Sequence, residues 1–297
     1  MPSTDKFQLV LFEGDFALPA IEPESIKSIL YCKIAEAPVT VRLFNSYRNC
    51  ALYKTPPLLL HDKVTCTDSE QIVAYLKCNN FNIDRELDPK QRSECLALKN
   101  LVQSKLKPAV EFNYWIEHRN STEFLNIWFM KCLPIPLNYF YTGNFRNRAV
   151  DLMESLYPNE TDKDVIKEYI QRAAIDCLQS LSSRLGNGEF FYGSKPTTLD
   201  VAVYSYVAPF IKIPFPLNEM YNVVNMWPNL VNLVKRIDNL YFPNVPKGSK
   251  YIRLEDKAKT TDDEVSYAAI VILTLSATSL ILGFAYKNGY LTGKIPD

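Results

Sequence analysis

Twenty-two consecutive residues near the end of the sequence carry no charged side chain, and they constrain the fold more than any other feature. This segment runs from Val265 to Tyr286 and is bounded by Asp262, Asp263 and Glu264 before it and by Lys287 after it. A helix needs about 20 apolar residues to cross the hydrocarbon core of a bilayer. The alternative, a buried core helix, seldom runs this long without a polar stripe. The segment therefore predicts one C-terminal transmembrane helix, with Val265 and Tyr286 at its ends.

The position of this span predicts how the chain meets its membrane. Only residues 287–297 follow it as a short tail, so we expect insertion after synthesis, as a tail anchor. The helix would then contact membrane lipid, and the bulk of the chain would face the cytosol. Moderate hydrophobicity of the span, together with Lys287 and Lys294 in the tail, favours the mitochondrial outer membrane. Residues 244–264 are expected to be a linker.

Composition argues against several classes of function. The chain has 33 Lys and Arg against 33 Asp and Glu, so it has no positive excess with which to neutralise nucleic-acid phosphates. It has 9 glycines and neither glycine-rich nucleotide motif. His61 and His118 lie far apart, and the seven cysteines form no C-x-x-C pair, which is typical of reduced cytosolic thiols. We therefore expect no nucleic-acid partner, no metal site and no cofactor.

Residues 5–78 have the pattern of a small α+β domain. Alternating side chains predict strands over 7–11 and 39–43, and the helix between them begins at Pro23. Because a helix joins these strands, they should be parallel. Two further short strands are predicted around a polar turn at 61–63, and Asp68 or Ser69 should cap the helix that follows.

This order resembles the thioredoxin-like domain of the glutathione transferases. In that family the proline matching Pro57 is cis, and the pair matching Asp68 and Ser69 grips the γ-glutamyl end of glutathione. The resemblance makes Pro57, Asp68 and Ser69 candidates for a vestigial glutathione site. From the sequence alone, Pro57 is equally compatible with a simple tight turn.

Residues 91–243 are predicted to form an all-helical second domain, after a polar linker over 79–90. Apolar residues recur at helical spacing over 165–185, and this helix should stop at Gly186. Thr197 and Asp200 form an [ST]-x-x-D capping box before a buried helix expected from Val201. That box resembles the one that opens the core helix of the transferase C-terminal domain, and we expect its role to be structural.

The residues after the first strand argue against transferase activity. An active enzyme of this fold needs a Tyr, Ser or Cys there to activate the thiol of glutathione. No Tyr, Ser, Thr or Cys lies between Glu13 and Pro23. Ser69 alone would hold glutathione without activating its sulfur. The chain is therefore predicted to have no catalytic residue, and the alternative is a membrane-tethered glutathione transferase or glutathione-binding protein.

The segment from Phe112 to Arg148 resembles the metaxins, through an F-x-x-W-I pattern and an M-x-x-x-P-x-P-L-N-x-F run that begins at Met130. The elements at 17–22 and 240–243 match the same family, and the C-terminal span is similar to that of its type-one branch. The resemblance implies a non-enzymatic subunit of the mitochondrial sorting and assembly machinery, which inserts β-barrel proteins. It also implies a second metaxin and the barrel-assembly core subunit as partners, with a transport-adaptor role as a further option.

A weaker hypothesis is that the chain is a mitochondrial fission protein similar to the ganglioside-induced differentiation-associated family. That family would need a long helical insertion, and none is found between Leu76 and Leu96.

The apolar, aromatic stretch from Pro134 to Phe145 is the candidate partner surface. Aromatic residues of helical domains are usually buried, so the alternative is that this stretch belongs to the interhelical core. The residues singled out for partner contact are Pro134, Pro136, Leu137, Asn138, Tyr139 and Phe140.

Overall fold

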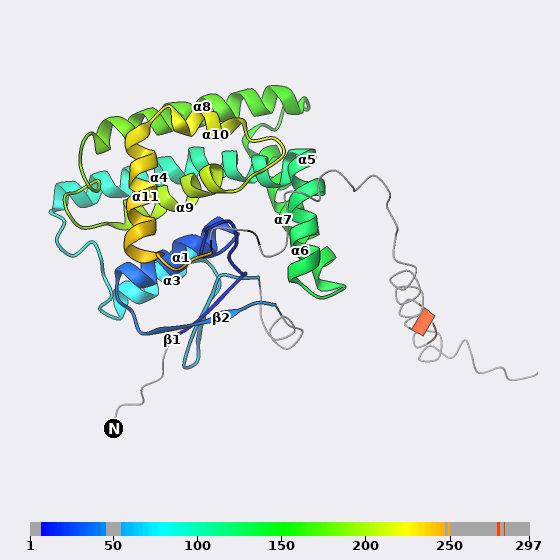
Figure 1. The fold of residues 1–297 in the computed structure, drawn as a ribbon, viewed down its shortest axis with the longest axis horizontal. Helices are drawn as coiled ribbons and strands as arrows, with labels where there is room; N and C mark the ends of the chain where they lie inside the picture. The colour runs from blue at the N-terminus through cyan, green and yellow to red at the C-terminus, as the bar shows by residue number, and fades with distance from the viewer. Residues whose placement is uncertain (1–6, 46–54, 247–248, 250–277, 280–281, 283–297) are drawn as a thin grey trace, which may run out of the picture. The chain divides into compact units, whose positions relative to one another are not determined.

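The computed structural model describes residues 7–45, 55–246, 249, 278–279 and 282. The described residues up to 249 belong to one compact unit, Met1–Ile252. Within it, a small sheet lies on one side, two helices cover the sheet, and a larger group of helices lies beyond them (Figure 1).

The sheet has four strands in the order β2-β1-β3-β4. They are β1 Phe7–Leu11, β2 Val39–Leu43, β3 Leu58–His61 and β4 Val64–Cys66. Strand β1 pairs parallel with β2 and antiparallel with β3, with Leu9 opposite both Val41 and Leu59. The predicted strands at 7–11 and 39–43 and their parallel pairing are confirmed. The hairpin turn is shorter than expected, because His61 still pairs with Val64 inside the ladder.

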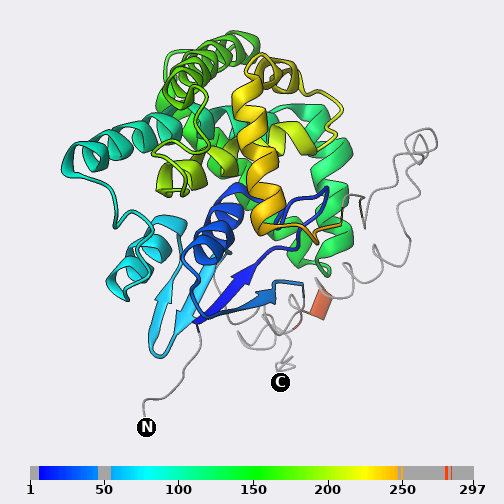
Figure 2. The same ribbon diagram turned by 60° about the vertical axis from the view of Figure 1, so that its left-hand side comes forward.

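Helices α1, Pro23–Ile34, and α3, Ser69–Cys78, lie between the sheet and the helical part of the unit (Figure 2). Pro23 occupies the first turn of α1, where a missing N–H costs no helical hydrogen bond. Asp68 is the N-cap of α3, and its side chain accepts a hydrogen bond from the backbone N–H of Glu70 at 3.0 Å. Both predicted helix starts are confirmed.

The helical part begins at α4, Pro89–Glu111, and ends with α11, Pro228–Tyr241. Helix α8, Lys163–Leu185, confirms the predicted helix over 165–185. Between α4 and α8 lie η1 Phe112–Ile116, α5 His118–Asn120, η2 Ser121–Leu125, α6 Asn126–Cys132 and α7 Leu137–Leu156, and α9 Thr198–Lys212 and α10 Glu219–Asn225 precede α11.

Helix α9 is the centre of the core, because every residue from Thr198 to Phe210 is buried. A helix that is apolar on all sides can be stable only when other elements surround it. Helices α1, α4, α10 and α11 all pack against it. It starts at Thr198, three residues earlier than the sequence predicts, directly after the predicted capping residue Thr197.

The predicted transmembrane span, with its ends Val265 and Tyr286, lies outside the described residues apart from three helical positions at 278, 279 and 282. Among the residues that are described, none belongs to a helix both long and apolar enough to cross a membrane.

Candidate functional site

Pro57 lines a single cavity of about 580 Å³ together with Asp68 and Ser69, which follow it by eleven and twelve positions. We call it the cis-proline cavity. Its walls come from the N-terminus of α1, the residues before β3, the start of α3, the end of α4 and part of α7, and they include Glu22, Lys107 and Arg148. The cavity therefore lies between the sheet domain and the helical domain, where the resemblance to transferases predicts a glutathione site.

The backbone edge of this cavity is made of two prolines. The Pro56–Pro57 peptide bond is cis, which decides between the two alternatives that the sequence left open. Neither proline has an N–H group, so neither can donate a main-chain hydrogen bond. At these two positions the edge offers only carbonyl acceptors to an extended peptide such as glutathione.

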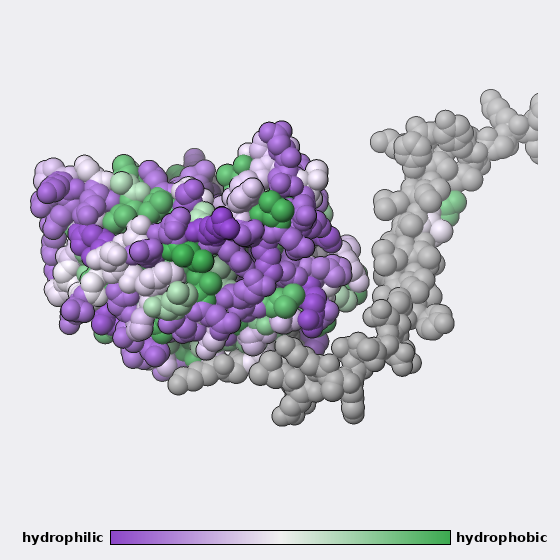
Figure 3. Space-filling model, turned by 90° about the horizontal axis from the view of Figure 1, so that it is seen from above, coloured by the Kyte–Doolittle hydropathy of each residue, from purple (hydrophilic) through white to green (hydrophobic). Residues whose placement is uncertain are grey.

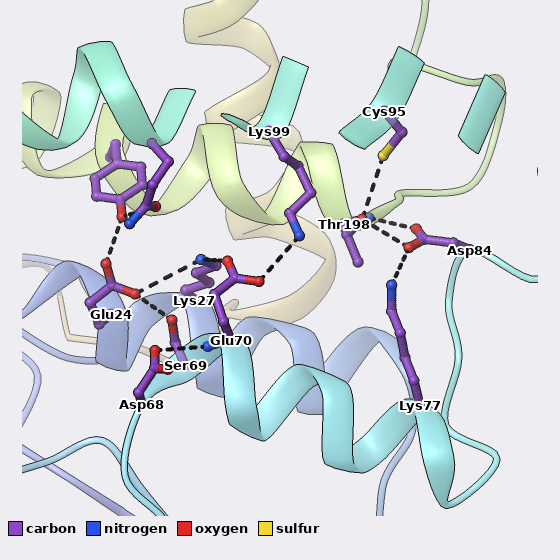
Figure 4. Close-up of polar contacts among 12 residues, drawn as sticks. Glu24, Lys27, Asp68, Ser69, Glu70, Lys77, Asp84, Cys95, Lys99 and Thr198 are labelled. Carbon is purple, nitrogen blue, oxygen red and sulfur yellow. Dashed lines mark hydrogen bonds and ion pairs between the residues drawn. The ribbon is translucent and has the colours of Figure 1, made fainter. Parts of the chain in front are cut away.

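Ser69 is fully buried, and its hydroxyl is already bound within the protein. The Ser69 Oγ donates a hydrogen bond to the Glu24 carboxylate, as Figure 4 shows. The same carboxylate accepts a hydrogen bond from the Tyr206 hydroxyl at 2.6 Å. An incoming carboxylate would have to displace Glu24 from Ser69, and it would meet the negative charge of Glu24 while doing so.

Glu24 remains ionised because cations and hydroxyl donors surround it. Burial opposes ionisation, but Lys27 and Lys107 together with the two hydroxyls outweigh it, and the pKa of Glu24 is lowered. The Lys27 and Lys107 ammonium groups lie 3.9 and 3.6 Å from the carboxylate. Lys27 also binds Glu70 on α3, which in turn pairs with Lys99 on α4 at 3.3 Å. This network joins α1, α3 and α4 (Figure 4).

A second carboxylic acid, Glu22, occupies the N-terminus of α1. It is the N-cap residue, and its side chain accepts a hydrogen bond from the backbone N–H of Ser25 at 2.7 Å. Burial and the nearby charge of Glu24 raise the pKa of Glu22 to about 8. Burial also raises the pKa of Glu111, to about 7. The helix end that could stabilise a bound thiolate is thus occupied by a side chain of the protein itself.

The loop after β1 binds residues that are distant in the sequence. The carboxylate of Asp15 accepts hydrogen bonds from Trp128 Nε1 at 2.8 Å and from Ser249 Oγ at 2.7 Å. The backbone N–H of Ala17 donates to the carbonyl of Pro246 at 3.0 Å. Gly14 is needed here, since a Cβ would lie 2.3 Å from the carbonyl oxygen of Leu18. Sequence analysis missed Asp15, because both side-chain partners are distant in sequence.

The cysteine nearest to this loop is unsuited to nucleophilic chemistry. Cys32 lies on α1 and is buried, and burial raises the pKa of its thiol to about 12, so almost none of it is thiolate at neutral pH. Within the described parts of the chain, no three His, Cys, Asp or Glu side chains are grouped so that they could hold a metal ion.

The predicted capping box is present at the start of α9, and its Asp200 carboxylate also binds one residue outside the box. The Asp200 carboxylate accepts from the backbone N–H and the hydroxyl of Thr197, both at 2.8 Å, and from the backbone N–H of Phe191 at 3.1 Å. Asp200 is fully buried, and burial raises its pKa to about 6. Thr197 and Asp200 therefore fix the start of the core helix.

Asp84 is a structural residue that sequence analysis placed in a featureless linker. It accepts hydrogen bonds from the backbone N–H and the hydroxyl of Thr198, both at 2.9 Å, and pairs with Lys77 Nζ at 2.7 Å (Figure 4). The segment after α3 thus fastens the sheet domain to the first turn of α9.

The six residues proposed as a partner surface divide into two groups. Asn138 is buried, while Pro134 and Leu137 are partly exposed. Tyr139 and Phe140 are 53% and 60% exposed, and Pro136 is exposed beside them. The aromatic residues that follow, Tyr141 and Phe145, pack around Phe12 of the sheet domain. Much of the stretch is therefore interhelical core, and its exposed part lies at the turn between α6 and α7.

Two family models match the chain. The model described as "Outer mitochondrial membrane transport complex protein" matches residues 25–146, and that described as "Glutathione S-transferase, C-terminal domain" matches residues 174–237. Metaxin-3 of Danio rerio is 32% identical over 243 residues, which are 80% of this chain and 76% of that protein. Metaxin-1 of Mus musculus is 26% identical over 289 residues, covering 96% and 91% of the two chains.

The solved structures that share this fold include glutathione transferases. The enzyme of Ceriporiopsis subvermispora in complex with glutathione has a TM-score of 0.53 at 13% identity, covering 79% of this chain and 97% of its own. The transferase GSTFuA3 of Phanerochaete chrysosporium gives 0.52 with the same identity and coverage. These similarities confirm the predicted pair of a sheet domain and a helical C-terminal domain.

Proposed function

The chain belongs to the metaxin family of outer mitochondrial membrane transport proteins, and on that premise we propose that it is a non-enzymatic subunit of the sorting and assembly machinery. In this role it takes part in protein import and in the insertion of β-barrel proteins. Its body faces the cytosol, and residues 265–286 anchor it in the outer membrane. Its partners are a second metaxin and the barrel-assembly core subunit, and the same body can serve as a transport adaptor.

The contact between Ser69 and Glu24 is the observation that best supports a non-enzymatic role. It uses the hydroxyl that would receive glutathione and puts a carboxylate where an anionic ligand would bind. Glu22 at the N-terminus of α1 and the missing N–H groups of Pro56 and Pro57 also support a non-enzymatic role. Together with the lack of a hydroxyl or thiol between Glu13 and Pro23, they support a role that does not involve thiol activation.

A pull-down from mitochondria in mild detergent tests the proposed partners. The bait is the full chain, compared with a version that ends at Asp263, and bound proteins are identified by mass spectrometry. We expect the full chain to recover a second metaxin and the barrel-assembly core. If the shorter version keeps the metaxin, that contact lies in the cytosolic body. If neither protein appears with either bait, the proposed function is wrong.

Glutathione binding is the second candidate function, favoured by the cis Pro56–Pro57 bond and by the meeting of Asp68 and Ser69 in one cavity. It predicts glutathione-dependent conjugation, or retention on immobilised glutathione, that is lost in Ser69→Ala. Ser93→Ala is the matched control, because Ser93 is an exposed serine on α4 whose hydroxyl binds only its own helix. If neither variant nor the wild type shows conjugation or retention, this candidate is excluded.

A further inference from the structure

The turn between α6 and α7 exposes four large apolar side chains within eleven residues. Met130, Ile135, Tyr139 and Phe140 have 47%, 42%, 53% and 60% of their surface exposed. They come from the end of α6, the connecting turn and the first turn of α7, which form the lower end of this helix pair in Figure 1. We call these four residues the α6–α7 tip.

The tip differs from the surface over α8 and α10. Seen from above, that surface shows small apolar patches separated by hydrophilic residues (Figure 3). Isolated apolar residues on a surface need no explanation, whereas a group of large ones usually marks a contact with a protein or a membrane.

The charged residues nearest to the tip along the chain are all positive. Residues 124–150 contain Lys131, Arg146 and Arg148 and not one Asp or Glu, in a chain whose net charge is zero. All three cations are exposed. Arg148 and Phe140 also line the cis-proline cavity, whose walls include Glu22 and Glu24. Lys131 follows Met130 within the tip, and Arg146 lies beyond it along α7.

This combination fits an anionic lipid surface better than a protein. Exposed tyrosines and other aromatic residues are favoured at the level of the lipid headgroups, and lysine and arginine are attracted to anionic lipids. The cores of protein interfaces, by contrast, are depleted in lysine.

The sequence also limits the distance between the body and the membrane of the predicted span. Fifteen residues, 250–264, separate Ser249 from the predicted span. At about 3.6 Å for each extended residue, they reach no more than about 54 Å.

We propose that the α6–α7 tip inserts Tyr139 and Phe140 among the headgroups of an anionic membrane, giving the cytosolic body a second contact with the bilayer. This inference rests on the proposed function, since it requires that the chain is held at a membrane. Protein contact at the same residues is the competing outcome.

Fluorescence quenching by lipid tests the proposal on the full chain. Phe140→Trp places a reporter at the tip, and Tyr221→Trp on α10, at a tyrosine that is 46% exposed, is the matched control. Each protein is reconstituted in vesicles of phosphatidylserine and phosphatidylcholine brominated near the headgroup, and the signal of the three native tryptophans is subtracted. We expect quenching of Phe140→Trp to exceed that of Tyr221→Trp at least about twofold. It should fall to the control level in Phe140→Trp combined with Lys131→Glu and Arg146→Glu.

Equal quenching of the two reporters would overturn the tip inference. So would a photo-crosslinker at position 140 that, in mitochondria, captures a protein instead of lipid. Flotation of the same vesicles separates this failure from that of the proposed function. If the full chain floats with vesicles but its tip reporter is not quenched, only the inference fails. If the chain does not float, membrane attachment fails and the inference with it.

Discussion

Replacing Asp200 by alanine should cost far more stability than the same change at Asp88, in the capping box of α4. The Asp200 carboxylate is buried and accepts two backbone N–H groups and one hydroxyl. In Asp200→Ala the N–H groups of Thr197 and Phe191 lose their acceptor where water cannot replace it. Each unsatisfied buried donor costs about 1–3 kcal/mol, so we expect a loss of about 2–5 kcal/mol in the free energy of unfolding.

Asp88→Ala is the matched control. Asp88 and Gln91 form the same reciprocal box at the start of α4, with hydrogen bonds of 2.8 and 3.0 Å, but they lie at the surface. Water can serve as the new partner there, so the expected loss is only about 1 kcal/mol. Asp200→Asn keeps one acceptor oxygen and should fall between the two.

Urea unfolding of the full chain in a non-ionic detergent, followed by tryptophan fluorescence, measures these differences. The comparison combines burial with the number of bonds lost, because the Asp200 carboxylate accepts three hydrogen bonds and that of Asp88 accepts one. Equal losses in Asp200→Ala and Asp88→Ala would refute the reasoning, since they would mean that the start of α9 is hydrated.

Three further predictions concern the network around α1 and the contact between the domains. The pKa of Glu22 is raised to about 8 from an ordinary 4.5, so between these pH values the folded chain keeps a proton that the unfolded chain has released. The bound proton stabilises the folded chain. This contribution to the free energy of unfolding is complete below pH 4.5 and is lost as the pH rises through about 8. Glu22→Gln should therefore flatten the decline of unfolding free energy across that range, and an unchanged slope in urea titrations would contradict the assignment. Asp84→Ala should cost about 2–4 kcal/mol by removing the acceptor that the N–H and hydroxyl of Thr198 share, with Asp84→Asn milder. Calorimetry that shows no change in melting temperature would count against this contact. Tyr206→Phe removes the hydroxyl that binds Glu24 and Gln103 and should cost about 1–3 kcal/mol in the same urea assay, and a neutral result would show that water replaces it.

The elements that the sequence predicts well are those whose signals are local. The strands at 7–11 and 39–43, the first residue of α1, the Asp68 cap and the Thr197–Asp200 box all depend on residues a few positions apart. The cis Pro56–Pro57 bond was an open alternative, since neighbouring residues do not decide it. The meeting of Pro57, Asp68 and Ser69 in one cavity followed from the family resemblance more than from any pattern.

The interactions that the sequence could not predict join distant residues. Asp84 lies 114 positions from Thr198, and Asp15 lies 113 positions from Trp128. Nothing in the sequence around Glu24 predicts that its carboxylate accepts a hydrogen bond from the hydroxyl of Ser69, 45 positions away. In each case the partner is fixed by how helices pack in space, and no spacing rule along the chain reports that.

The two contacts that hold residues 246 and 249 on the loop after β1 have a mechanical consequence. A pull on the chain beyond Ser249 first loads the bonds from Ser249 to Asp15 and from Pro246 to Ala17. Asp15 is in turn tied to Trp128, and the loop continues directly from β1, which lies inside the sheet between β2 and β3. Tension is therefore shared between the sheet and the helical domain. It does not act first on the C-terminal end of α11.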